Sequence, residues 1–300
     1  MRRVHWPGWL CGPLIFCATF KLSAAPVTFN TALPISKGEG VVRVQAKYLS
    51  ATDDPGPTNR ELGVKALPIV GVWGVTSRWT LFGSVPLLNK TMELDTPPGR
   101  IKRSVNGLGD VTAMVRYTAY SKDQPGSTIR IAPFTGIEMP TGKDDEQDAL
   151  GRLPGPLQLG SGAWNPLIGA VSTAQSLKQE WGVSTSYKFN NAANGFERGD
   201  EARLDLAYHR RVWMGGPADG LPHFFYAGVE SNWVWQDKNR NNGVKDPDSG
   251  GTTFYLAPTL QYVTRRTVAE HALQLPVVQN LNGNALEQDF IFTLSLRLNY

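Results

Sequence analysis

The sequence predicts an all-β protein, a transmembrane antiparallel up-and-down β-barrel of about twelve strands. Three observations support this class. The last predicted strand alternates between apolar and polar residues and ends on an aromatic residue, Tyr300. Long connections alternate with tight turns along the chain. After the amino-terminal segment, no run reaches the roughly twenty consecutive apolar residues that a membrane-spanning helix needs.

The last strand, 288–300, shows the alternation most clearly. Side chains on a strand point to opposite faces with a period of two. One face of this strand therefore carries only apolar residues: Phe290, Phe292, Leu294, Leu296, Leu298 and Tyr300. A soluble sandwich can alternate in the same way, but an apolar face that ends the chain on an aromatic residue is more typical of a transmembrane barrel.

Residues 1–25 have the features of a secretory signal peptide. Arg2 and Arg3 form a basic start, Leu10–Phe20 is a short apolar stretch, and 23–25 offer a small-residue exit. Both cysteines, Cys11 and Cys17, lie inside this segment. The chain after it would therefore have no disulfide, no thiolate metal ligand and no thiol nucleophile.

The remaining chain divides into a short amino-terminal segment and the barrel. Residues 26–40 look too few for a plug domain, but they could tuck into the lumen. Residues 41–300 form the barrel, and alternation bounded by turn residues predicts its strands in order. The predicted strands are 41–50, 60–75, 77–88, 107–121, 127–139, 163–177, 179–190, 201–214, 222–235, 252–264, 266–279 and 288–300.

The connections between these strands alternate in length. The long ones are 51–59, 89–106, 140–162, 191–200, 236–251 and 280–287. The short ones are 76–77, 122–126, 178, 215–221 and 265. Outer-membrane barrels have long external loops and short periplasmic turns, whereas a Greek-key sandwich has no reason to alternate so strictly.

Four strands show clear outward faces. These are Val42, Val44, Ala46 and Tyr48 in the first strand; Val111, Ala113, Val115 and Tyr117 in the fourth; Trp181, Val183, Thr185, Tyr187 and Phe189 in the seventh; and Phe254, Leu256, Leu260 and Tyr262 in the tenth. A charge on the lipid face costs about 2–4 kcal/mol at mid-bilayer, so the near absence of charge on these outward faces meets a physical constraint.

Six tryptophans lie near strand ends and predict an interfacial girdle, with ordinary packing as the alternative: Trp73, Trp79, Trp181, Trp213, Trp233 and Trp235.

The opposite parity carries charge, which we predict lines the lumen. The basic members are Arg43, Lys47, Lys65, Arg78, Arg116, Arg130, Lys188, Arg203, Arg211 and Arg297. The acidic members are Asp110, Glu138, Asp205, Glu230, Glu270 and Asp289. Two interpretations stay open: cross-strand pairs that fill a narrow barrel, or a water-filled pore with a mild preference for anions.

Other sites have weaker support. The three histidines after the signal segment, His209, His223 and His271, form no His-x-Ser pair, so we predict no catalytic residues. The loop 237–248 alternates oxygen ligands as calcium loops do, but it has no closing Glu, and a polar external loop explains it better. No metal and no cofactor are therefore predicted.

The net charge is +4, and the lysines and arginines are dispersed singly along the chain, which argues against nucleic acid as a partner.

Three short motifs resemble a known family. Gly107-Leu-Gly-Asp-Val111 opens the fourth strand, Pro140-Thr-Gly142 starts the longest loop, and Leu159-Gly-Ser-Gly162 closes it. With the aromatic end at Tyr300, most of the chain after the signal segment resembles the outer-membrane family named for the MetA pathway of phenol degradation. The resemblance implies an outer-membrane β-barrel of transporter type, with small and often aromatic or hydrophobic compounds as substrates. It implies no catalytic residues.

The sequence thus favours a monomeric channel in the outer membrane of a Gram-negative bacterium, which passes small solutes by passive diffusion through a charged lumen. Its expected partners are outer-membrane lipid, lipopolysaccharide, the solute, and the barrel-assembly machinery acting on Tyr300. Two alternatives remain: a structural or adhesive barrel that acts through its external loops, and an outer-membrane lipid hydrolase.

Overall fold

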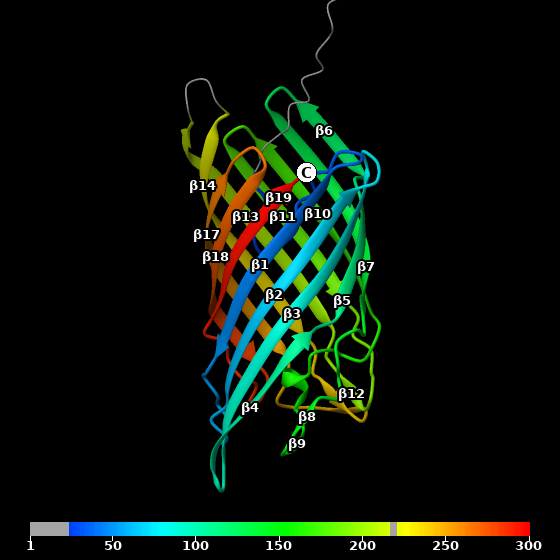
Figure 1. The fold of residues 1–300 in the computed structure, drawn as a ribbon, viewed down its shortest axis with the longest axis vertical. Helices are drawn as coiled ribbons and strands as arrows, with labels where there is room; N and C mark the ends of the chain where they lie inside the picture. The colour runs from blue at the N-terminus through cyan, green and yellow to red at the C-terminus, as the bar shows by residue number, and fades with distance from the viewer. Residues whose placement is uncertain (1–23, 217–220) are drawn as a thin grey trace, which may run out of the picture.

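A computed structural model describes residues 24–216 and 221–300. Within these residues, twelve antiparallel strands close into a barrel, and Figure 1 shows them tilted around one axis. The ring order is β1-β2-β3-β5-β7-β10-β11-β13-β14-β17-β18-β19, and β19 pairs with β1 to complete it. The predicted fold class and strand number are confirmed. No helix in the described part of the chain is long and apolar enough to cross a membrane.

The ring strands agree with the predicted ranges at most positions. They are β1 (Gly40–Ala51), β2 (Glu61–Gly74), β3 (Trp79–Thr96), β5 (Val111–Tyr117), β7 (Ser127–Met139), β10 (Asn165–Ser176), β11 (Gln179–Lys188), β13 (Glu201–Gly215), β14 (His223–Gln236), β17 (Gly251–Val263), β18 (Thr267–Leu281) and β19 (Phe290–Asn299). Short pieces lie outside the ring: β4 (Gly99–Leu108), β6 (Tyr120–Gln124), β8 (Gln147–Asp148), β9 (Gly151–Arg152), the 3-10 turn η1 (Gly155–Leu157), β12 (Phe196–Glu197), β15 (Arg240–Asn241) and β16 (Val244–Lys245).

One predicted loop and one predicted strand are wrong in the same region. Residues 89–106 were expected to be a loop, but they extend β3 and form β4, which pairs with it in a hairpin. The predicted strand 107–121 is broken at Gly109 and Asp110, so that β4 ends before β5 begins. Asp110 turns away from the strand ladder to bind the loop that follows β7, and this breaks the strand.

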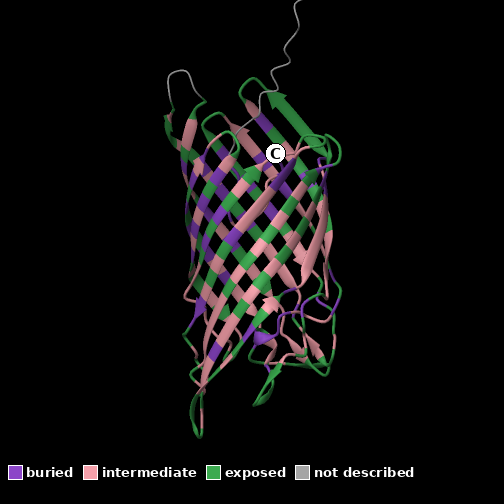
Figure 2. Cartoon of the chain, in the orientation of Figure 1, coloured by how far each residue is buried: buried purple, intermediate pink, exposed green. Residues whose placement is uncertain are grey.

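Burial follows the expected alternation around the ring, as the checkered strands in Figure 2 show. Leu294, Leu296 and Leu298 of β19 are about half exposed, whereas Thr293 and Ser295, which alternate with them, are buried. The six predicted girdle tryptophans are all exposed. Trp73, Trp79, Trp181 and Trp213 lie at one end of their strands and Trp233 and Trp235 at the other, so the aromatic residues mark both rims of the lipid-facing surface.

The two ends of the barrel differ as predicted. One end carries Tyr300 and the tight turns, such as Leu177-Lys178 between β10 and β11. The other carries the long loops, including 140–164 and 237–250. By the general rule for outer-membrane barrels, the turn end faces the periplasm and the loop end faces outward. The predicted signal segment lies outside the described residues except for Ala24 and Ala25.

Candidate functional site

The lumen of the barrel is occupied by the chain's own amino-terminal residues. Residues 24–39, the lumen segment, enter the barrel near the periplasmic end and lead into β1. Ala24, Val27 and Ala32 are almost fully buried. Of the short segment at 26–40, which could tuck into the lumen, the part up to Leu33 contacts the inner wall, whereas residues 36–38 are exposed and Gly40 begins β1.

One end of the lumen segment is fixed to β14 and β17. The Glu230 carboxylate accepts hydrogen bonds from the backbone N–H of Val27 at 2.7 Å, from that of Thr28 at 2.9 Å, and from the Thr28 hydroxyl at 2.5 Å. The Gln261 amide of β17 donates to the Ala25 carbonyl at 2.6 Å. Bonds to a charged acceptor are the stronger class, so Glu230 is the main anchor of this end of the lumen segment.

The other end is fixed to β5 and β10. The Arg116 guanidinium of β5 donates to the carbonyl oxygens of Thr31 and of Leu33, the latter at 2.7 Å. The Thr173 hydroxyl of β10 accepts from the Ala32 N–H at 2.8 Å. In the ring order β5 and β17 are six strands apart in either direction. The lumen segment therefore spans the full diameter of the barrel.

Charged side chains line one side of the lumen around the lumen segment, from β13 to β1. Arg43 of β1 lies 2.7 Å from the Glu270 carboxylate of β18 and also donates to the Val27 carbonyl at 2.9 Å. Arg297 of β19 lies 3.9 Å from the same carboxylate. His209 of β13 contacts Glu230 at 3.1 Å, and both side chains are fully buried. These inward side chains form ion pairs or hydrogen bonds with one another.

Further predicted residues lie at inward-facing positions of their strands, toward both ends of the barrel. Arg203 pairs with Asp205 at 3.2 Å, and Lys188 with Glu138 at 3.5 Å. Arg130 pairs with Asp123 at 2.7 Å near the turn end, and Arg211 lies over the Phe224 ring at 5.0 Å. Lys47 shares the inward parity of Arg43 on β1. Whether these residues line a conducting pore remains a prediction.

Three predicted residues lie elsewhere. Lys65 pairs in register with Tyr48 and shares its exposed outward face. Apolar residues occupy both faces of β2, so the sequence could not show which face points into the lumen. Lys65 lies near the loop-side rim, where a lysine side chain can extend to water. Arg78 is exposed in the turn before β3 and donates to the Tyr117 hydroxyl at 3.2 Å. Asp289 precedes β19, where the Ser50 hydroxyl donates to it at 2.7 Å.

The long loop between β7 and β10 is held at the outer mouth by Asp110. The Asp110 carboxylate accepts from the N–H groups of Gly142 at 2.9 Å and Ser161 at 2.6 Å, and from the Ser161 hydroxyl at 2.9 Å. A Cβ on Gly160 would lie 2.3 Å from the Gly142 carbonyl oxygen, so the two loop ends meet only because both are glycines. The glycine-rich motifs thus form a loop clamp.

The clamped loop packs an apolar cluster into the mouth. Leu153, Leu157 and Leu159 of the loop contact Met92 of β3 and Val105 of β4. Farther out, Arg103 binds Asp148 at 2.7 Å, and this hydrogen-bonded guanidinium lowers the pKa of the exposed Asp148 carboxyl. The loop therefore covers part of the outer opening.

Two inward charges were missed. Glu180 of β11 is fully buried in the lumen and accepts from Gln175 at 3.0 Å. Glu180 lies on the same face of β11 as Lys188, so the alternation that predicts Lys188 inward also predicts Glu180 inward. Lys90 of β3 donates to the Gln158 carbonyl at 2.5 Å; it lay in the stretch that was interpreted as loop.

The histidine and calcium candidates have other partners. His209 contacts Glu230 and not Asp205, its neighbour on the same strand face, and the pair holds the lumen segment. In the 237–248 loop, Asp237 faces two cations, Arg240 at 3.6 Å and Lys245 at 3.7 Å. The described residues hold no group of three or more His, Cys, Asp or Glu side chains that could bind a metal.

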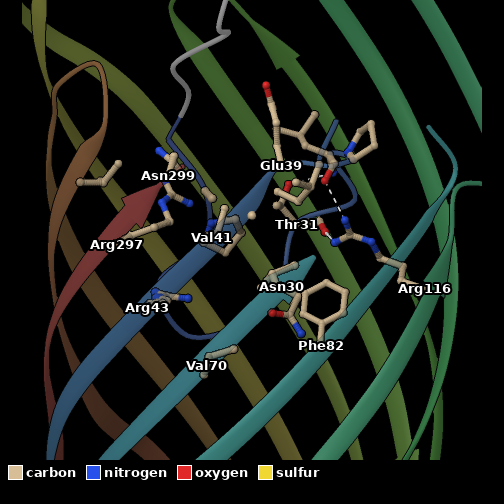
Figure 3. A pocket seen from close by; sticks show the side chains of 18 of the residues that line it. Asn30, Thr31, Glu39, Val41, Arg43, Val70, Phe82, Arg116, Arg297 and Asn299 are labelled. Carbon is tan, nitrogen blue, oxygen red and sulfur yellow. Dashed lines mark hydrogen bonds between the residues drawn. The ribbon is translucent and has the colours of Figure 1, made fainter. Parts of the chain in front are cut away.

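A cavity of about 540 Å³ lies beside the lumen segment at the turn end. Figure 3 shows Val70 and Phe82 on its wall, with Arg116 reaching across to Thr31. Arg43, Arg297 and Asn299 lie on its other side. This volume is within the roughly 300–1,000 Å³ range of small-molecule pockets.

Comparisons with known proteins agree with this architecture. The sequence model of a family described as "Putative MetA-pathway of phenol degradation" matches residues 66–285. No curated protein matches the chain. Among solved structures, an outer membrane channel from Pseudomonas putida F1 is 14% identical with a TM-score of 0.65, over 93% of this chain and all 100% of that chain. This similarity concerns the fold, which is that of an outer-membrane β-barrel.

Two further solved barrels are more distant. The NanC porin is 11% identical with a TM-score of 0.46, over 86% of this chain and 98% of that chain. The β domain of the Bordetella autotransporter BrkA is 12% identical with a TM-score of 0.43, over 88% of this chain and 100% of that chain.

Proposed function

This chain belongs to the family named for the MetA pathway of phenol degradation, and from that premise we propose that it is an outer-membrane channel for small solutes, aromatic compounds among them. Solutes would cross passively along their gradient, through a lumen that opens when the lumen segment moves. The family description supports the solute class, and the similarity to an outer membrane channel supports transport as the function.

One observation carries the proposal: among the described residues, the stretch Ala25–Leu33 crosses the barrel without backbone pairing to a strand, and the lumen segment first pairs with the wall at Gly38 and Glu39, beside Gly74 of β2. Between Ala25 and Leu33 the hydrogen bonds of the lumen segment to the wall are made with wall side chains such as Glu230, Arg116 and Thr173. A strand in the ladder cannot leave without opening the barrel. A segment held by side chains can leave while all twelve strands stay paired.

Planar-bilayer recording of the purified chain tests this function. We expect a mostly closed channel with intermittent openings, because the lumen segment spans the barrel. Replacing residues 26–36 by a Gly-Ser linker of equal length should give a steady open current. A heat-dependent shift in gel mobility shows that each variant is folded. A folded linker variant without conductance would contradict the channel function.

A further inference from the structure

The cavity beside the lumen segment combines an apolar wall with several arginines. Val41, Val70, Val72 and Phe82 form the apolar wall, contributed by β1, β2 and β3. Five arginines also line the cavity: Arg43, Arg116, Arg130, Arg265 and Arg297. Among the described lining residues only Glu39 has an acidic side chain. Arginine and apolar side chains therefore lie side by side in the cavity, as Arg116 does with Phe82.

The arginines are not equivalent in their partners. Arg43 and Arg297 lie against Glu270, at 2.7 and 3.9 Å, and Arg130 lies 2.7 Å from Asp123. Within the described chain, Arg116 makes no ion pair with a carboxylate. Its guanidinium donates to two neutral backbone carbonyls, those of Thr31 and Leu33.

Arg116 is also deeply placed. Its residue exposure is 3%, its guanidinium lies 4.9 Å from the centre of the Phe82 ring, and its Nε has no hydrogen-bond partner among the described residues. A buried guanidinium with only neutral partners is costly. A carboxylate offers it two parallel charge-assisted bonds in a geometry that matches its donor fork.

We propose that this cavity binds a small amphipathic carboxylate, such as an aromatic acid, with its carboxylate on Arg116 and its apolar body against Val70, Val72 and Phe82. The inference rests on the proposed channel function and adds the solute class. A neutral aromatic compound fills the apolar side equally well but leaves the guanidinium without a charged partner. The site therefore selects for the anion.

Binding also bears on the lumen segment. The carboxylate competes with the Thr31 and Leu33 carbonyls for the same guanidinium donors. A carboxylate is the better acceptor, so its arrival frees the β5 end of the lumen segment while Glu230 still holds the other end. The solute that occupies the site thus loosens the segment that blocks the lumen.

Calorimetric titration of the full purified chain with benzoate, and with neutral benzyl alcohol as the matched probe, tests the site. We expect benzoate to bind at least tenfold more tightly than benzyl alcohol. Arg116→Gln should remove that advantage, Arg116→Lys should keep part of it, and Arg78→Gln, in an exposed turn outside the cavity, should leave it unchanged. Equal binding of the two probes, or benzoate binding that survives in Arg116→Gln, overturns the proposal. Arg116→Lys serves as the test if Arg116→Gln does not fold.

The coupling to the lumen segment has its own measurement. Ala32 is fully buried, so maleimide should label Ala32→Cys slowly, and benzoate should accelerate labelling several-fold while benzyl alcohol does not. Unchanged labelling at saturating benzoate overturns the coupling. These measurements need no current, so a chain that conducts without binding benzoate refutes this inference alone. A chain that binds benzoate through Arg116 but never conducts refutes the channel.

Discussion

At the scale of single residues, Glu230 determines where the lumen segment lies. Its carboxylate accepts three hydrogen bonds from Val27 and Thr28 and contacts His209. Hydrogen bonds to a charged group contribute about 1.5–3 kcal/mol each. These bonds form only when the segment is in the lumen, so the Glu230 carboxylate stabilises the segment in that position.

Glu230→Gln should therefore raise the open probability of the channel several-fold, because the neutral amide replaces a charged acceptor. Single-channel recording measures the effect. Glu61→Gln is the matched control, since Glu61 lies at the start of β2 and pairs with Arg100. An open probability equal to that of the wild type in both variants would show that Glu230 does not anchor the segment.

Gly40 is the second residue with a specific steric role. It exchanges both backbone hydrogen bonds with Tyr300, at 2.9 and 3.0 Å, where the barrel closes. A Cβ at this position would lie 2.5 Å from the Tyr300 ring, whereas a Cβ at Gly71 would meet nothing within 4 Å. Only glycine at position 40 leaves room for the Tyr300 ring over the junction of β1 and β19.

Gly40→Ala should lower the temperature at which the folded band converts to the unfolded band on a gel, because the Tyr300 ring must move away. Gly71→Ala, also in the barrel wall, should shift this temperature little. An equal effect of the two substitutions would contradict a specific contact between the ring and Gly40.

At the scale of elements, the loop clamp explains why Asp110 interrupts the wall. The carboxylate binds both ends of the loop between β7 and β10, and the loop's leucines pack against β3 and β4. Asp110→Ala should release this loop and speed tryptic cleavage after Arg152 by several-fold. Asp123→Ala, at the opposite end of the barrel, should not. Equal cleavage rates in both variants would show that the clamp does not hold the loop.

The elements also show what the sequence could and could not predict. Strict alternation correctly predicted the inward and outward faces of β1, β11 and β19, because one face of each strand is mainly polar and the other apolar. The alternation failed in β2, where both faces are mainly apolar, because the inward residues line the cavity or pack against the apolar cluster of the loop. It also failed at 89–106, because a hairpin that extends beyond the ring carries charged residues on both faces: Glu93 and Lys102 on one face, and Arg103 on the other.

The contacts of the lumen were beyond sequence reasoning for a different reason. Parity showed that Glu230 and Arg116 point inward, but their partners are residues 24–33, which are distant in sequence and carry no alternation of their own. The partner of His209 likewise lies on the neighbouring strand, β14, and not on its own strand. Pairing across a barrel depends on register and diameter, which no local pattern encodes.

At the scale of the whole molecule, the outward surface must meet lipid. Leu294 lies on β19 with 53% of its surface exposed, and Leu150 lies in an external loop with 62% exposed. Leu294→Arg should lower folding stability by about 2–4 kcal/mol if its site is near mid-bilayer. Leu150→Arg should be neutral. Urea-dependent folding into liposomes measures both, and equal stability of the two variants would contradict a lipid-facing β19.

The central claim is that solutes cross only when the lumen segment leaves the lumen. The hydroxyls of Thr31 and Thr173 lie 3.1 Å apart, and the chain's own cysteines, Cys11 and Cys17, both precede the lumen segment. The double variant Thr31→Cys/Thr173→Cys can therefore lock the segment to β10 by a reversible disulfide. In planar bilayers, we predict that oxidation abolishes the current and that reduction restores it. The same steady current in both states, with the disulfide verified by mass, would contradict the account.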